Sequence, residues 1–72
     1  MKKSKFEIRR TINVEQWGKI TAESSTLNSI SLVLRESAKL NERIGADATA
    51  RLRKRQAKQI YDGLAKTGFY ED

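Results

Sequence analysis

Apolar and polar side chains alternate along residues 5–14. The apolar positions of this stretch are Phe6, Ile8, Ile12 and Val14. A period of two that is rich in β-branched and aromatic residues is typical of a β-strand with one buried face. Arg10 interrupts the apolar series. We therefore expect this strand to lie at the edge of a sheet or to pair across a dimer axis.

Residues 13–25 fit two interpretations. In the first, Asn13 is the N-cap of a helix, because Gln16 follows three residues later as in a capping box. In the second, residues 17–23 form the returning strand of a hairpin. Gly18 weakens both interpretations, and in a helix interior it costs about 1 kcal/mol relative to alanine. Between the two we favour the helix.

Trp17 is the one large aromatic residue whose role is open. It shares a helical spacing with Val14 and Ile20, which favours a place in the apolar core. The alternative is stacking on a base of single-stranded nucleic acid, a common role for exposed aromatic side chains in such proteins. We predict that Trp17 packs in the core.

Residues 27–44 carry the clearest helical pattern in the chain. The apolar positions are Leu27, Ile30, Val33, Leu34, Leu40 and Ile44. The N-cap candidates are Thr26, Asn28 and Ser29. Gly45 directly follows the last apolar position, as is typical of the residue after a helix end. We expect a helix that ends at this glycine.

A further helix is predicted from residue 48 to residue 62 or 66, with Asp47 as its cap. Gly63 and Gly68 are the candidate ends, and Phe69 and Tyr70 are expected to fold back onto the core. These elements predict an α+β fold that is mostly helical. It consists of an N-terminal β-strand, or a short hairpin, followed by two to three helices.

We expect one small domain over residues 1–72, with a flexible basic arm at residues 1–5 and a C-terminal tail at residues 69–72. Such a short chain buries only about 60% of the surface that it exposes when unfolded. It contains no cysteine and no histidine, which excludes disulfides and the usual zinc ligands. We therefore predict a homodimer. The apolar stripe expected to form it includes Leu27, Ile30, Leu34 and Leu40.

Basic residues outnumber acidic ones by 15 to 9, for a net charge of +6. Five of them lie between residues 51 and 58, where there is no acid: Arg51, Arg53, Lys54, Arg55 and Lys58. A helix places four of these, all except Arg53, on one face. A second basic group near the N-terminus contains Lys2, Lys3, Lys5 and Arg9. Together they predict a two-part surface that binds nucleic acid, and the alternative is a solvated face that only aids solubility.

Chemistry that would indicate an enzyme is missing from the sequence. There is no histidine base or cysteine nucleophile, and the four glycines do not form a phosphate-binding loop. Tyr61 and Tyr70 are better explained as core or rim aromatics than as nucleophiles. We expect a non-enzymatic protein without cofactor or metal. No stretch approaches the length of a membrane span, so we expect a soluble, cytoplasmic protein without a membrane partner.

The stretch Phe6-Glu7-Ile8-Arg9 resembles the ribbon of the ribbon-helix-helix DNA-binding proteins, and residues 29–37 resemble the start of their second helix. The resemblance implies that two ribbons pair across a dimer and that their outward side chains enter the major groove. It implies Lys5, Glu7 and Arg9 as the reading residues. It also implies that the backbone amides near Ser29 bind a phosphate.

Taken together, these features predict a small dimeric protein that binds nucleic acid, with DNA favoured over RNA. A regulator of transcription or accessory factor of bacterial, phage or plasmid type would have this composition. The alternative is a small adaptor or inhibitor, for example one encoded by a phage, that binds an acidic surface of a host protein.

Overall fold

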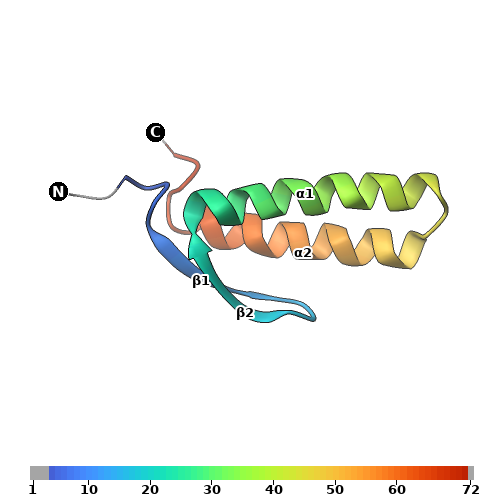
Figure 1. The fold of residues 1–72 in the computed structure, drawn as a ribbon, viewed down its shortest axis with the longest axis horizontal. Coiled ribbons are helices and arrows are strands. Elements are labelled where there is room, and N and C mark those ends of the chain that lie inside the picture. Colours follow the sequence, from blue (N-terminus) through green and yellow to red (C-terminus); the bar gives the residue numbers. More distant parts are fainter. Residues whose placement is uncertain (1–3, 72) are drawn as a thin grey trace.

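The computed structural model describes residues 4–71, in which two strands are followed by two helices. The elements are β1 (Arg9–Val14), β2 (Gly18–Glu23), α1 (Ser24–Arg43) and α2 (Asp47–Ala65). The strands form an antiparallel hairpin, and the helices lie side by side in opposite directions (Figure 1). The predicted α+β, mostly helical class is confirmed, with a hairpin and two helices.

Within residues 13–25 we favoured a helix, but the chain there forms the turn and the second strand of the hairpin. That prediction is wrong. The Trp17 N–H donates to the Val14 carbonyl at 3.0 Å and closes the turn. Gln16 and Gly18 have φ values of +69° and +72°. These values are incompatible with a right-handed helix, and glycine adopts them at little cost. The conformational freedom of Gly18 therefore serves the turn.

The strand pairing also differs from that of the ribbon-helix-helix proteins. β1 pairs with β2 of the same chain, in a register that runs from Arg9 opposite Glu23 to Val14 opposite Gly18. The resemblance implied pairing between two chains. It also placed the amides near Ser29 at a helix N-terminus, but α1 begins five residues earlier and those amides lie inside it.

The first strand is shorter than the alternation predicted. It begins at Arg9, and residues 4–7 form a turn in which the Glu7 N–H donates to the Ser4 carbonyl at 3.0 Å. Lys5 and Glu7 therefore do not extend the ribbon, contrary to what the resemblance implied. Only Arg9 of the three predicted reading residues lies on a strand.

The helix α1 begins at Ser24 rather than beyond the predicted caps. Both the hydroxyl and the N–H of Ser24 donate to the Ile8 carbonyl, at 2.7 and 2.9 Å, which joins the start of the helix to the chain just before β1. The predicted end is confirmed. Gly45 follows the helix with a φ of +81°, and the Ala46 N–H donates to the Asn41 carbonyl at 2.8 Å.

The helix α2 begins at Asp47, which belongs to its first turn and does not cap it, because Ala46 is the N-cap residue. Gly63 does not end this helix but lies inside it, facing the strand β1. A Cβ at Gly63 would come within 2.9 Å of the Ile12 Cδ1. The glycine therefore allows the strand to pack closely on the helix.

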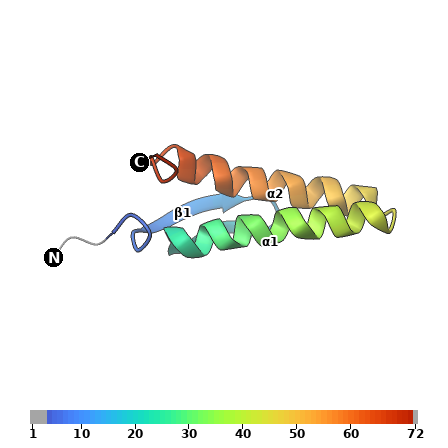
Figure 2. The same ribbon diagram turned by 90° about the horizontal axis from the view of Figure 1, so that it is seen from above.

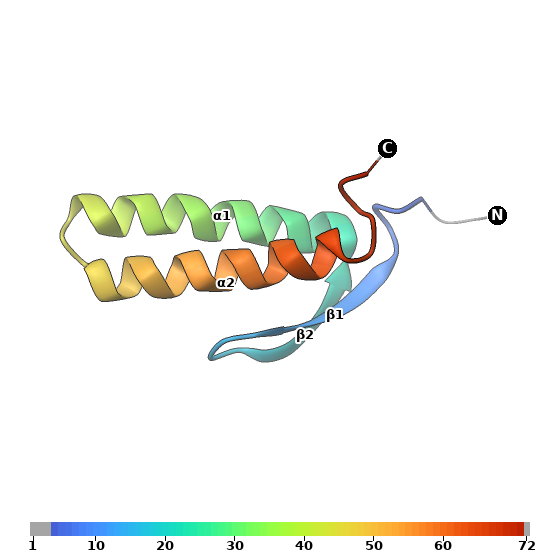
Figure 3. The same cartoon turned by 180° about the vertical axis from the view of Figure 1, so that it is seen from behind.

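The hairpin covers one side of the helix pair, and the core lies between these two layers (Figures 2 and 3). The core residues are Ile12, Val14, Leu27, Leu34, Ala57, Ile60, Leu64 and Phe69. Phe69 folds back after α2, as predicted, and its ring meets the Phe6 ring edge-on with 5.5 Å between centroids. Phe6 thereby holds the N-terminal turn against the C-terminal segment.

Trp17 does not lie where the sequence placed it. It is 43% exposed at the hairpin turn and not in the core, so that prediction is wrong. Tyr61 and Tyr70, expected as core or rim aromatics, are exposed and stack on each other with 4.5 Å between ring centroids. The helix pair extends well past the hairpin turn, toward the loop that joins α1 to α2 (Figure 1).

Candidate nucleic-acid interface

The basic cluster of residues 51–58 lies on α2, as predicted, but most of its charges are paired with acids. Arg55 forms two hydrogen bonds with the Glu15 carboxylate, from Nε to Oε1 and from Nη2 to Oε2, both at 2.9 Å. This contact joins α2 to the hairpin turn. The Arg55 hydrogen bonds hold the pKa of Glu15 below its ordinary value, and the same contact raises the pKa of Arg55.

Two more cations of the cluster pair with acids on the helices. Lys54 forms an ion pair with Glu42 of α1, and Lys58 lies 2.9 Å from Asp62 one turn further along α2. Exposed pairs of this kind contribute at most about 1 kcal/mol, so a phosphate can replace them. Their acids nevertheless lower the positive potential that the cluster presents to a polyanion.

The remaining two cations of the cluster differ from each other. Arg53 is half-buried and donates to the Gln56 side-chain oxygen at 2.9 Å. Arg51 is exposed and makes no ion pair with any residue between 4 and 71. Because Arg55 reaches the hairpin and Lys54 reaches α1, the four residues that the helical spacing placed on one face do not form a row of unpaired charge.

The N-terminal basic group is also divided. Lys2 and Lys3 lie outside the described residues. The Lys5 ammonium donates to the Glu71 carbonyl at 2.7 Å and lies 5.5 Å from the centre of the Phe6 ring, so it packs on the C-terminal segment. Arg9 is exposed at the start of β1.

The hairpin presents a polar surface on the side away from the helices. Alternate residues of both strands face outward, and all six are exposed: Arg9, Thr11, Asn13, Lys19, Thr21 and Glu23. They form three cross-strand pairs, and in the central pair the hydroxyls of Thr11 and Thr21 lie 2.7 Å apart. The face is hydrophilic, with Glu23 as its one acid at the end near α1.

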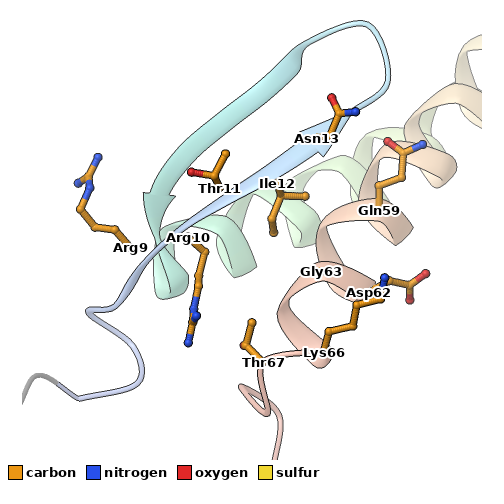
Figure 4. Close-up of a pocket in the computed structure, with 10 residues that line it drawn as sticks. All are labelled: Arg9, Arg10, Thr11, Ile12, Asn13, Gln59, Asp62, Gly63, Lys66 and Thr67. Atoms are coloured by element: carbon orange, nitrogen blue, oxygen red, sulfur yellow. The ribbon is translucent and has the colours of Figure 1, made fainter.

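A groove runs along β1 on the side of α2 (Figure 4). It has a volume of about 730 Å³ and is lined by Arg9, Arg10, Thr11, Ile12, Asn13, Gln59, Asp62, Gly63, Lys66 and Thr67. In Figure 4, Arg9 points away from the groove, whereas Arg10 points toward Thr67 at the end of α2. With Lys66, the groove and its rim carry three cations against Asp62, which already pairs with Lys58.

The groove follows an unpaired strand edge. The Ser24 N–H donates to the Ile8 carbonyl, so these residues form a hydrogen-bonded pair in the same register as the hairpin. Hydrogen-bonded and non-hydrogen-bonded pairs alternate along an antiparallel ladder. The backbone N–H and C=O groups of Arg9, Thr11 and Asn13 therefore point away from β2, along the groove.

Buried polar residues fix this arrangement, and the sequence did not reveal them. Gln56 is fully buried, and its amide donates to the Glu15 carbonyl at 2.9 Å. The Gln59 side-chain oxygen accepts from the Glu15 N–H at 2.7 Å. Both glutamines thus hold the hairpin turn on α2. Lys19 and Lys66 were also missed. The alternation of polar residues in the strands would have indicated Lys19 on the outward face of a hairpin, whereas Lys66, at the end of α2, left no such signal.

Comparison with known proteins finds no matching family model, no matching curated protein and no matching solved structure. Within residues 4–71, no helix is long and apolar enough to cross a membrane. The same part of the chain has no group of three carboxylate, imidazole or thiol side chains placed to hold a metal ion. The function is therefore inferred from the surfaces described above.

Proposed function

We propose that this protein binds duplex DNA without enzymatic activity, as a cytoplasmic regulator or accessory factor, and that the outward face of the hairpin makes the contact. The observation that carries this proposal is the set of six exposed polar side chains on that face. A two-stranded antiparallel ribbon has the width of the major groove. Within the groove, asparagine pairs with adenine and threonine accepts several bases. The cations Arg9 and Lys19 lie at opposite ends of the face and would contact phosphates.

Cations near the ribbon support the same assignment. Arg10 on β1 and Lys66 at the end of α2 line the groove beside the ribbon, so they would face the phosphates along one side of the DNA major groove that the ribbon enters. The α2 cluster contributes less in this proposal, because three of its cations are paired with acids. Duplex RNA fits less well, since its major groove is deep and narrow.

The test is a comparison of two variants that remove the same charge from different surfaces. The ribbon variant combines Arg9→Gln with Lys19→Gln, and the helix variant combines Lys54→Gln with Lys58→Gln. Affinity for labelled duplex DNA would be measured by fluorescence anisotropy at several salt concentrations. Four phosphate contacts, from Arg9, Arg10, Lys19 and Lys66, give an expected slope of log affinity against log salt of about −3.6, from about −0.9 for each contact.

We expect the ribbon variant to bind more weakly than the helix variant and to reduce the slope by about 1.8. A larger loss in the helix variant would place the contact on the helices, and equal losses would refute the assignment to the hairpin. Absence of binding to duplex DNA at low salt would refute the proposal. Parallel titrations with single-stranded DNA and RNA establish which nucleic acid is preferred.

A second candidate function is supported by the open edge of β1. An extended segment of another protein can add a strand to such an edge through main-chain hydrogen bonds. The cations Arg10 and Lys66 beside it favour an acidic segment, as expected of an adaptor that binds an acidic host protein. Hydrogen exchange tests this second function. A bound acidic strand would slow exchange of the backbone amides of Thr11 and Asn13 that point away from β2 at the strand edge. DNA bound to the outward face of the hairpin would leave these amides free to exchange.

A further inference from the structure

A stripe of apolar side chains on α1 is left uncovered by the rest of the described chain. Three of its members are mostly exposed: Val33 at 67%, Leu40 at 57% and Ile44, directly after the helix, at 78%. With Ile30 and Ser37 they occupy positions 30, 33, 37, 40 and 44. The steps alternate between three and four residues, which is the spacing that keeps a seam against a partner helix over several turns.

These five positions form the exposed seam of α1. It is distinct from the side of α1 that packs within its own chain. The buried residues Leu27, Ser31, Leu34 and Ala38 follow the same steps on another side of the helix, and this side packs on α2. We predicted that Leu27 and Leu34 belong to a dimer stripe. Because both are buried against α2, they cannot contact a partner. The exposed seam also extends past the hairpin turn, where the hairpin no longer covers the helices (Figure 1).

We propose that the exposed seam binds the same seam of a second copy in antiparallel orientation. Charges beside the seam select this occupant and this direction. Glu36 and Arg43 are opposite in sign, seven residues apart, and each precedes a seam position. When Val33 lies opposite Ile44 of the second copy, Ser37 lies opposite Leu40. This register brings Glu36 next to Arg43 of the second copy, twice by symmetry. A parallel pair would not bring these charges together.

The shape of the surface fits the same register. A hollow of about 450 Å³ lies between Trp17 and α1, with Ile30 and Val33 in its wall. Ile44, the most exposed of the large apolar residues, would enter this hollow on the second copy because it lies opposite Val33. Trp17 then forms part of the interface, which accounts for its exposed position at the hairpin turn. The small Ser37 opposite Leu40 leaves room for the larger side chain.

Sedimentation over a range of concentrations, without DNA, tests the pairing independently of the proposed function. We expect wild-type protein to reach twice the chain mass of 8.2 kDa at high micromolar concentration. Leu40→Asp should weaken pairing by more than about tenfold, because a symmetric interface carries each change twice. Leu32→Asp is the matched control, because Leu32 is exposed on the same helix and borders the seam without occupying one of its positions. It should weaken pairing less than Leu40→Asp. Circular dichroism verifies that both variants are folded.

Charge reversal tests the orientation. Glu36→Arg or Arg43→Glu alone should weaken the dimer, and the two changes combined in one chain should restore it. A monomer at every concentration would overturn the proposal, even if the seam binds another protein. A dimer that tolerates Leu40→Asp, or that is not restored by the double reversal, would overturn the interface and its register.

Discussion

Replacement of Gly63 by alanine tests whether β1 packs on α2 as closely as described. Gly63 lies inside α2, and a Cβ built on it would meet three atoms of the Ile12 side chain. The distances are 2.9 Å to Cδ1, 3.1 Å to Cγ1 and 3.3 Å to Cγ2. Ile12 belongs to the buried core, and only the part of its side chain that lines the groove can move away from a new methyl group.

Two opposing effects determine the size of the change. In an exposed helix interior, alanine would be more stable than glycine by about 1 kcal/mol. Forcing an extra methyl group into a packed core costs about 1 to 3 kcal/mol. An overpacking cost near the middle of this range exceeds the helix gain by about 1 kcal/mol. We therefore expect Gly63→Ala to lower the free energy of unfolding by about 1 kcal/mol. In a domain of this size that lowers Tm by about 4 to 8 °C.

Ile12→Val provides the control, because it removes the Cδ1 atom that lies nearest to the new methyl group. Alone it should cost about 0.5 to 1.5 kcal/mol. In that background, the alanine at position 63 should cost little or should stabilise the helix. Urea denaturation followed by circular dichroism on the four proteins of this cycle gives the coupling energy. If Gly63→Ala stabilised the wild-type protein, or if the two changes were additive, the described contact would be refuted.

Three further predictions concern the residues that hold the hairpin and the C-terminal segment. Gln56→Met should cost about 1 to 3 kcal/mol in urea denaturation, because it removes the buried amide that donates to the Glu15 carbonyl. The pKa of Glu15 is lowered by Arg55, so the stability from this pair is present above about pH 4.5 and is lost as the pH falls through the lower folded-state pKa. Arg55→Gln should remove that part of the acid dependence of Tm, whereas Arg51→Gln should keep it. Phe69→Ala should cost about 3 to 5 kcal/mol in thermal unfolding, and a change below 1 kcal/mol would show that the ring is not in the core.

Local patterns were sufficient for part of the fold. The helical spacing of residues 27–44 and the glycine that follows predicted α1 and its end, because both signals depend on neighbours within one turn of helix. Alternation predicted β1, and the basic cluster was correctly assigned to a helix. For residues 14–24 the local signals were ambiguous, since Val14, Trp17 and Ile20 fit the spacing of a helix and the turn chemistry of Gly18 fits a hairpin. Pairing with β1 decided between them.

The candidate site depended on contacts between residues far apart in the sequence. The sequence alone indicated that cations gather on one face of the helix that contains residues 51–58. Only the tertiary structure brought Glu15 to Arg55, 40 residues away, and Glu42 to Lys54. Such ion pairs leave no periodic signal, because they depend on how the hairpin and α1 pack against α2. The same packing decided which apolar side of α1 is buried and which remains exposed to a partner.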